Sequence, residues 1–208
     1  MNLSDWRIEY DKYSLHEENL PVDPYPLFNT WFDKAAEDKN QEPNAFILST
    51  VSSAMEPESR VVLLKEIEDR NFVFYTNYTS RKGQDLEVNP KVCMLFFFPL
   101  SQRQIRIKGI ATKLSREKAL AYFSTRPIES QISAMASPQS SRTTREELIQ
   151  KAASLREIGD ITCPETWGGY GITPSYFEFW QGQPGRLHDR IIYEKNITQI
   201  WDQYRLAP

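Results

Sequence analysis

Between residues 44 and 113 the chain is dominated by short segments rich in β-branched and aromatic residues, and this pattern restricts the fold more than any other feature. Clusters of turn-forming residues separate the segments, for example Ser52–Pro57 and Glu68–Asn71. Such spacing indicates consecutive antiparallel strands. The five expected strands are Ala45–Val51, Arg60–Ile67, Phe72–Thr76, Val92–Phe98 and Gln104–Thr112.

Helix signals flank this strand-rich region. Asp23 followed by Pro24 predicts a capped helix start, Ser115 begins a helix that stops at Arg126-Pro127, and Thr144 with Glu147 forms a capping box for a helix to about Ile158. Further strands are expected near Gly169–Ile172, Tyr176–Gln181, Leu187–Tyr193 and Ile197–Leu206. Many short strands with few helices between them favour a mainly β (α+β) fold, a closed or partly closed barrel with helices at its ends.

Length and composition exclude several classes of protein. A chain of 208 residues is expected to form one domain. Its 25 basic and 28 acidic residues give a net charge of −3, which argues against nucleic-acid binding. The longest apolar run, Val92–Phe98, is too short for a membrane helix, and the N-terminus does not resemble a signal peptide. The two cysteines and two histidines have no ligand spacing, so no metal site is expected, and the default is a cytoplasmic protein.

The segment Thr79–Gly83 places two cations where a helix begins. Thr79 or Ser80 can cap the helix, and Arg81 and Lys82 then lie in its first turn, against the helix dipole. A bound phosphate would reverse that effect, because the helix N-terminus and both cations favour an anion. A tolerated surface clash is the alternative.

A second group of cations lies near the C-terminus. Arg186, His188 and Arg190 alternate, so on a strand their side chains share one face, with Asp189 on the other. Cations this close disfavour one another unless an anion or an electron-rich ring lies over them. A solvated strand face is the alternative.

Two further pairs of residues are weaker signals. Arg60 and Lys65 would point to opposite faces of a regular strand, and so would serve different anions, or one site through a bulge. Tyr122 and Arg126 share a helix face, and with Ser130 they offer donors to a phosphate, although a plain surface pair fits equally. No dinucleotide fingerprint, P-loop or nucleophile elbow is present, so the pattern favours a phosphorylated cofactor that carries the chemistry.

Taken in order, eleven stretches from about residue 5 to the end resemble the pyridoxamine/pyridoxine 5′-phosphate oxidase family. The sequence Arg-Leu-His-Asp-Arg after Trp-Gln-Gly is the most specific of them. Ile128, Ser133 and Met135 depart from the family's commonest residues, and none of them removes a phosphate contact. The matching stretches are Arg60–Lys65, Phe72–Asn77, Ser80–Lys82, Arg103–Arg106, Tyr122–Pro127, Ser130–Ile132, Ala136–Ser140, Trp167–Tyr170, Phe179–Gly182, Arg186–Arg190 and Arg205–Pro208.

The resemblance implies an FMN-binding split β-barrel of antiparallel Greek-key type, and a homodimer with FMN at the subunit interface. It implies one domain over residues 1–208, with residues 1–20 as a flexible N-terminal segment and strands from about 169 to 208 completing the site. The implied FMN contacts are Arg60, Val61, Val62, Leu63, Leu64, Lys65, Tyr75, Thr76, Arg81, Lys82, Gln104, Gln139, Ser140, Trp180 and Arg190. The implied substrate contacts are Lys65, Tyr122, Arg126, Ser130, Arg186 and His188, with Arg7 and Tyr10 on the N-terminal segment that covers the site.

The resemblance also implies a reaction. Pyridoxamine or pyridoxine 5′-phosphate would be oxidised to pyridoxal 5′-phosphate, with a hydride equivalent passing to FMN and O2 then giving H2O2. Arg186 and His188 would hold the substrate against the flavin, and His188 could assist proton movement. Two alternatives are another split-barrel flavin oxidoreductase and a non-catalytic protein that binds FMN or a vitamer.

Overall fold

The structure is a computed structural model that describes residues 1–5, 8–39 and 42–208. The chain forms two compact units, each assembled from separate stretches of sequence. Unit 1 comprises Met1–Leu48, Cys93–Gly109 and Pro174–Pro208, and unit 2 comprises Ser49–Val92 and Ile110–Thr173. The single domain expected over residues 1–208 stays a prediction.

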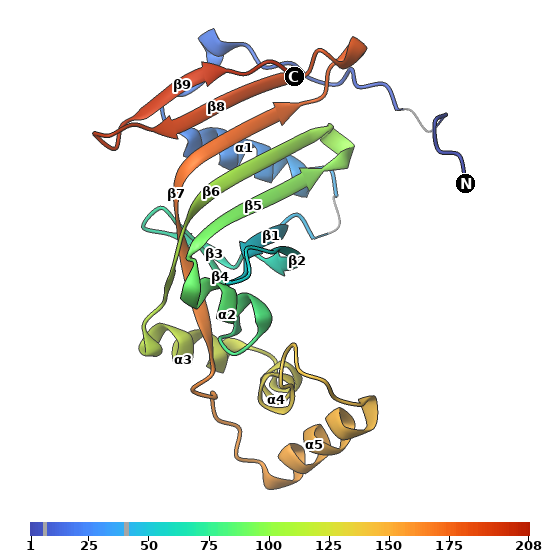
Figure 1. The fold of residues 1–208 in the computed structure, drawn as a ribbon, viewed down its shortest axis with the longest axis vertical. Helices are drawn as coiled ribbons and strands as arrows, with labels where there is room; N and C mark the ends of the chain where they lie inside the picture. The colour runs from blue at the N-terminus through green and yellow to red at the C-terminus, as the bar shows by residue number, and fades with distance from the viewer. Residues whose placement is uncertain (6–7, 40–41) are drawn as a thin grey trace. The chain divides into compact units, whose positions relative to one another are not determined.

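The strands form one sheet in the order β2-β1-β5-β6-β7-β4-β3, and β8 pairs with both β7 and β9 (Figure 1). The pairs β3–β4, β4–β7, β7–β8 and β8–β9 are antiparallel. Their bounds are β1 Ala45–Val51, β2 Pro57–Leu63, β3 Glu66–Glu68, β4 Asn71–Asn77, β5 Lys91–Phe98, β6 Arg103–Lys113, β7 Trp167–Gln181, β8 Asp189–Lys195 and β9 Trp201–Arg205.

Five α-helices and three short 3₁₀ helices are found within the described residues. They are α1 Pro24–Glu37, α2 Arg81–Val88, α3 Arg116–Thr125, α4 Ile128–Ala136 and α5 Arg145–Ile158, with η1 Glu17–Asn19, η2 Pro99–Ser101 and η3 Pro184–Arg186. Among the residues that can be described, no helix is both long enough and apolar enough to cross a membrane.

In unit 1, α1 covers one face of the sheet (Figure 1). The Asp23 side chain caps the helix by accepting from the Tyr25 N–H, as the sequence predicts. The apolar stripe of α1 is buried: Phe28 lies edge-on to Phe96 of β5, and Trp31 lies edge-on to Phe179 of β7. These aromatic contacts form the core of the unit, since side chains of this size contribute most of the buried apolar area.

Residues 9–17 are held to the rest of unit 1 by hydrogen bonds between their backbone and side chains elsewhere in the unit. Oε1 of the buried Gln102 accepts from the backbone N–H groups of Asp11 and Lys12, and its Nε2 donates to the Glu9 carbonyl. Further along, the Leu15 N–H donates to Asp189 at 3.0 Å. This part of the segment that the sequence predicts to be flexible therefore has defined partners.

In unit 2, helix capping follows the sequence closely. Ser80 caps α2 through the Gly83 N–H, Ser115 caps α3, and Thr144 with Glu147 makes the full capping box of α5. In the antiparallel pairing of β4 and β7, Tyr75 lies opposite Gly169. A Cβ at Gly169 would come within 2.9 Å of the Tyr75 ring, so the absence of a side chain at Gly169 leaves room for this ring over the strand.

Four features differ from the sequence predictions. The strand expected over Arg60–Ile67 is interrupted, because β2 ends at Leu63 and β3 begins at Glu66. The two strands expected at Gly169–Ile172 and Tyr176–Gln181 are one long strand, β7. Strand β8 begins at Asp189 rather than Leu187, and the sequence did not predict α4. The sequence also predicts a short helix that Ser4 caps and that carries Trp6, Arg7 and Tyr10; Trp6 and Arg7 lie outside the described residues.

Candidate active site

Unit 2 contains a cavity of about 810 Å³, a size typical of a small-molecule site. Twelve residues predicted as cofactor or substrate contacts line it, together with residues from the turn and helix that follow Tyr122. The full lining is Arg60, Val61, Val62, Leu63, Lys65, Tyr75, Thr76, Asn77, Lys82, Tyr122, Thr125, Arg126, Pro127, Ser130, Ser133, Ala134, Ser137, Gln139 and Trp167.

Lys82 is a buried cation at this cavity, 8% exposed, in the first turn of α2. Its ammonium donates to Gln139 Oε1 at 3.1 Å, Thr76 Oγ1 at 3.3 Å and Ser80 Oγ at 3.4 Å. All three partners are neutral, and within the described part of the chain no carboxylate pairs with Lys82. Burial, followed by the charge of Arg60, lowers the pKa of Lys82 from its ordinary value. An anion in the cavity would offset that cost.

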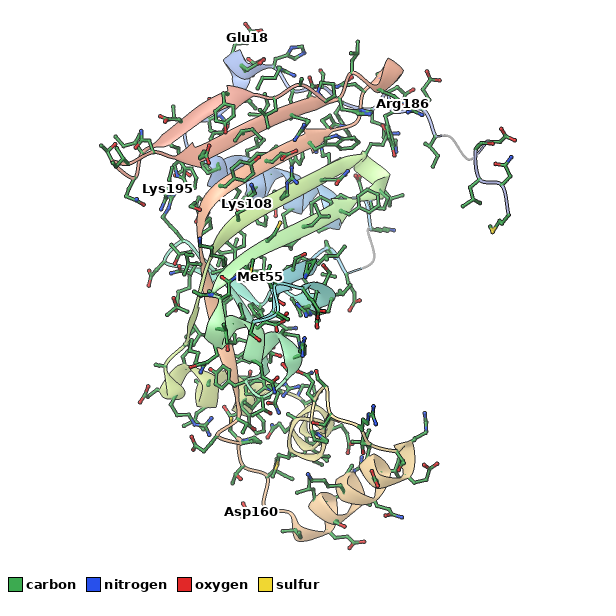
Figure 2. All side chains as sticks on the ribbon, in the orientation of Figure 1. Glu18, Met55, Lys108, Asp160, Arg186 and Lys195 are labelled. Atoms are coloured by element: carbon green, nitrogen blue, oxygen red, sulfur yellow. The ribbon has the colours of Figure 1, made fainter. Side chains whose placement is uncertain are left out.

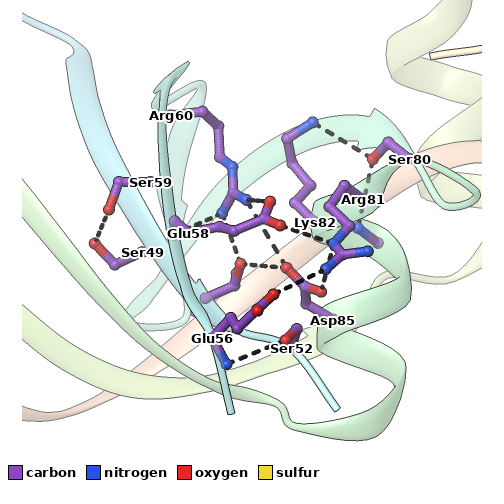
Figure 3. Close-up of polar contacts among 12 residues, drawn as sticks. Ser49, Ser52, Glu56, Glu58, Ser59, Arg60, Ser80, Arg81, Lys82 and Asp85 are labelled. Atoms are coloured by element: carbon purple, nitrogen blue, oxygen red, sulfur yellow. Dashed lines mark hydrogen bonds and ion pairs between the residues drawn. The ribbon is translucent and has the colours of Figure 1, made fainter. Parts of the chain in front are cut away.

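Arg60 lines the same cavity and also forms ion pairs with two carboxylates that do not line it (Figure 3). Its Nη2 lies 3.1 Å from Glu58 and 3.8 Å from the buried Asp85. Arg81 also pairs with Glu58, at 2.8 Å, and with Asp85, at 3.6 Å. The side chain of Arg81 is 47% exposed and does not line the cavity, so the predicted pair Arg81 and Lys82 separates into a surface cation and a cavity cation.

Three aromatic rings stand nearly parallel in the cavity wall. The Tyr75 and Tyr122 ring centroids are 3.8 Å apart, and Trp167 lies 5.5 Å from Tyr75. The Arg126 guanidinium lies over the Trp167 ring at 4.8 Å. Its Nη1 is buried and has no hydrogen-bond partner among the residues that the structure describes. Burial lowers the pKa of Arg126 as well, and no carboxylate of the described residues pairs with this half-buried cation.

Lys65 and Ser130 complete the predicted substrate contacts in unit 2. The interruption after β2 leaves Lys65 exposed, with its backbone N–H donating to the Val73 carbonyl, and both Arg60 and Lys65 line the cavity. The sequence argument that a regular strand would separate the two cations therefore does not apply, because the strand is not regular here. Ser130 lies in α4, one turn beyond Arg126.

The cavity lining and the predicted contacts differ at several positions. Three predicted contacts in unit 2, Leu64, Arg81 and Ser140, do not line the cavity; Leu64 is buried and the other two are exposed. Most of the lining residues that the sequence missed belong to the α3–α4 turn and α4, where no helix was predicted. Trp167 carried a signal, as part of a family stretch, but had no assigned role. The missed residues are Asn77, Thr125, Pro127, Ser133, Ala134, Ser137 and Trp167.

The other predicted FMN contacts lie in unit 1, around a cavity of about 280 Å³ lined in part by Gln104, Trp180 and Arg190. Arg190 Nε pairs with Glu178 at 2.9 Å, and Arg106 pairs with the same carboxylate. Burial opposes the charge of Glu178, but the hydrogen bonds from Arg190 and Arg106 hold the pKa of this carboxyl below its ordinary value. The ion pair with Glu178 therefore fixes the direction of the Arg190 side chain on β8.

The prediction that Arg186, His188 and Arg190 share a strand face is wrong. Arg186 ends η3 in the loop before β8 (Figure 2), with φ +63°, directly after Gly185 at φ +62°. Two consecutive residues in the left-handed region turn the chain, so the strand alternation does not begin until Asp189. His188 lies in the loop too, and only Arg190 is on β8.

His188 packs in a small aromatic cluster of unit 1. Its ring lies 4.7 Å from Trp180 and 5.8 Å from Tyr10. The Gln183 N–H donates to His188 Nδ1 at 3.0 Å, so in the neutral ring Nε2 carries the hydrogen. Burial, followed by the charge of Arg186, lowers the pKa of His188 from its ordinary 6.5. The ring is therefore a neutral Nε2–H donor at pH 7. Arg7 lies outside the described residues.

Two family models match the chain, one on each side of residues 157–166. The model described as pyridoxamine 5′-phosphate oxidase matches residues 32–156. The model described as the pyridoxine 5′-phosphate oxidase C-terminal dimerisation region matches residues 167–208.

Known proteins are similar to the chain over its full length. A pyridoxine/pyridoxamine 5′-phosphate oxidase of Leptospira interrogans is 44% identical over 210 residues, covering 99% of this chain and 98% of the relative. The same description applies to a relative from Bordetella avium, 44% identical, with complete coverage of both chains. Among solved structures, PhzG from Burkholderia lata 383, in complex with tetrahydrophenazine-1-carboxylic acid, has a TM-score of 0.89 at 30% identity, covering 96% of this chain and 100% of PhzG.

This likeness and the antiparallel strand pairs confirm the expected mainly β, split-barrel fold with flanking helices. The sequence resemblance is confirmed as well, by matches to both parts of the chain and by full-length relatives. The chain belongs to the pyridoxamine 5′-phosphate oxidase family.

Proposed function

We propose that this protein is an oxidoreductase that converts pyridoxamine 5′-phosphate and pyridoxine 5′-phosphate to pyridoxal 5′-phosphate, with FMN as hydride acceptor and O2 reduced to H2O2. The alcohol would give the aldehyde directly, whereas water would hydrolyse the imine formed from the amine and release ammonia. One observation carries the proposal: two cations without a carboxylate partner among the described residues, Lys82 and Arg126, line one cavity from different helical segments. A reaction that joins a phosphorylated cofactor to a phosphorylated substrate needs two such sites.

The residues present fit an FMN phosphate at the Lys82 end. The ammonium already has three neutral oxygens around it, and burial makes its charge unfavourable until an anion arrives. Ser80 caps α2, so the helix N-terminus adds a favourable dipole at the same place. Thr76 and Gln139 orient the ammonium, and Arg60 supplies a second positive charge.

Arg126, Tyr122, Ser130 and Lys65 are proposed to hold the substrate phosphate. The unpartnered Arg126 Nη1 offers a donor, and the Trp167 ring behind the guanidinium fixes its plane. Holding the phosphate in this way limits the motion of the pyridine ring, so the reacting carbon is positioned rather than activated.

Arg186 and His188 are proposed to hold the other side of the substrate. The neutral His188 ring can donate from Nε2, while its Nδ1 stays fixed by the Gln183 N–H. Tyr10 packs against both His188 and Trp180, which is a suitable position for closing this side of the site to water.

A homodimer with FMN at the subunit interface is part of the proposal. The match of residues 167–208 to a dimerisation region supports it. Val61, which lines the cavity, is 65% exposed, and Phe97 on β5 is 53% exposed. Both apolar side chains are therefore open to burial by a second subunit.

Anaerobic mixing of the flavin-loaded protein with pyridoxamine 5′-phosphate tests the reaction. The visible flavin absorbance should bleach, and unphosphorylated pyridoxamine should bleach it far more slowly because Arg126 has no phosphate to bind. Binding of the phosphorylated vitamer without bleaching would show a non-catalytic binding protein instead.

The likeness to PhzG favours one further candidate, oxidation of a polycyclic carboxylic acid. Tetrahydrophenazine-1-carboxylic acid belongs in the same mixing experiment. Bleaching by that acid, and not by pyridoxamine 5′-phosphate, would replace the proposed substrate.

A further inference from the structure

Asp85 is a buried carboxylate close to the cavity cations, yet it does not line the cavity. It lies on α2, one turn after Arg81, and is 3% exposed. Its Oδ2 accepts a hydrogen bond from Thr50 Oγ1 at 2.7 Å. Thr50, on β1, is only 1% exposed. A buried carboxylate is costly unless it is paired and hydrogen-bonded, so the partners of Asp85 are informative.

The Thr50 hydroxyl also contacts Arg60. Arg60 Nη1 donates to Thr50 Oγ1 at 2.7 Å. Its Nη2 lies 3.8 Å from Asp85, and Figure 3 shows the Arg60 and Asp85 side chains pointing toward one another. The direction of these hydrogen bonds is fixed by chemistry. An ionised carboxylate only accepts and a guanidinium only donates, so the hydroxyl must give its hydrogen to Asp85 and present a lone pair to Arg60.

Arg60 is the one member of this chain of contacts that reaches the cavity. Arg60 also contacts Glu58, whose side chain is 35% exposed and shared with Arg81, and its Nη1 donates to the Glu58 carbonyl at 3.2 Å. A partly exposed, shared ion pair holds a long side chain less firmly than a buried contact, because solvent competes for it. The buried contact through Thr50 is therefore the firmest of these side-chain contacts.

We propose that Asp85, acting through the Thr50 hydroxyl, is a positioning residue that orients Arg60 for the phosphate of the flavin cofactor. The inference rests on the proposed FMN site and assigns a role to two residues that do not line it. If Asp85 served only to balance the charge of the cations, replacing it should change the affinity for FMN in the opposite direction. Removing a carboxylate beside cations makes the site more positive and should tighten anion binding, whereas loss of positioning should weaken it.

The experiment is an equilibrium titration of the full chain, freed of flavin, with FMN, followed by flavin fluorescence. Thr50→Val keeps the shape of the side chain but removes the hydroxyl, and should weaken FMN binding about tenfold. Thr50→Ser restores the hydroxyl and should retain the wild-type affinity. Asp85→Asn should weaken binding in the same direction as Thr50→Val, because an amide no longer forces the direction of the hydroxyl.

Two controls connect the effect to Arg60. Ser49→Ala removes a neighbouring hydroxyl on β1 that is hydrogen-bonded to Ser59, and should not change FMN affinity. In an Arg60→Gln background, Thr50→Val should have no additional effect. If Asp85→Asn does not fold, the Thr50 pair still decides the question.

The outcomes are separable from those of the proposed function. A wild-type chain that fails to bind FMN overturns the proposed function itself. A wild-type chain that binds FMN, with Thr50→Val of equal affinity, overturns the positioning role alone. Tighter binding by Asp85→Asn, equal losses in Thr50→Val and Thr50→Ser, or a loss that persists without Arg60 would each overturn it as well.

Discussion

Replacing Lys82 by methionine should weaken FMN binding without lowering the free energy of unfolding of the flavin-free protein. Methionine has nearly the same length and suits a buried position. In the flavin-free protein Lys82 is 8% exposed and its ammonium has only neutral hydrogen-bond partners among the described residues, so its charge destabilises the folded state. Lys82→Met removes that charge, and the free energy of unfolding without flavin should stay equal or rise. Gln139 loses the ammonium as a donor but keeps the Thr76 hydroxyl at 3.1 Å, and it is exposed to water.

FMN binding should change in the opposite direction. The variant loses one charge-assisted contact to the phosphate, worth about 1.5–3 kcal/mol. That range corresponds to a dissociation constant about tenfold to 150-fold higher. The pH dependence follows from the lowered pKa. Between the folded pKa and the ordinary value of 10.5 the unfolded chain binds more protons, so the wild-type gains stability as pH rises. The stability advantage of Lys82→Met should therefore shrink toward pH 10.5.

Urea unfolding of the flavin-free proteins and FMN titration measure the two effects. Lys151→Met, an exposed lysine on α5 that does not line the cavity, is the matched control and should change neither quantity appreciably. The reasoning is refuted if Lys82→Met binds FMN as tightly as the wild type. It is equally refuted if the flavin-free variant is clearly less stable, because the lysine would then have a favourable partner.

Three other outcomes are expected. Arg126→Leu should raise KM for pyridoxamine 5′-phosphate at least tenfold while flavin content stays normal, because Nη1 loses a phosphate partner; steady-state kinetics beside flavin absorbance would show it. Arg186→Gln should raise the pKa of His188 partway toward 6.5, leaving the larger effect of burial, in an NMR titration with His16 replaced to simplify assignment; an unchanged pKa would contradict it. Sedimentation of the flavin-loaded protein should give twice the mass of one chain, and a monomer that keeps FMN would exclude the interface site.

Local signals were read correctly from the sequence where a few adjacent residues decide the structure. The caps at Asp23, Ser115 and Thr144 are examples, because each satisfies backbone donors within three residues of itself. The cations of the candidate site were also identified by residue type and by resemblance. Their environment was not, because the Lys82 ammonium is hydrogen-bonded to Gln139, which is far along the chain.

The predictions that failed or stayed open concern local irregularities that residue type does not signal. A regular strand would send Arg60 and Lys65 to opposite faces, and one site through a bulge was the alternative; the structure favours the latter, because the strand is interrupted at the buried Leu64 and both residues line one cavity. Arg186 and His188 do not alternate along a strand, because the backbone at Arg186 is in the left-handed region. An arginine gives no sign of this conformation in the sequence. Helix α4 follows directly on Pro127 without a side-chain cap, so no start signal was available.

The hydrogen bonds that fasten residues 9–17 have a consequence for how the chain meets proteases. Lys12 is a tryptic site in sequence, but a protease must draw the backbone around its target into an extended strand across its own cleft. The N–H groups of Asp11 and Lys12 already share Gln102 Oε1, and the Leu15 N–H is held by Asp189. Cleavage after Lys12 therefore requires this stretch to detach first, so its rate reports how often the N-terminal segment leaves the aromatic cluster at His188.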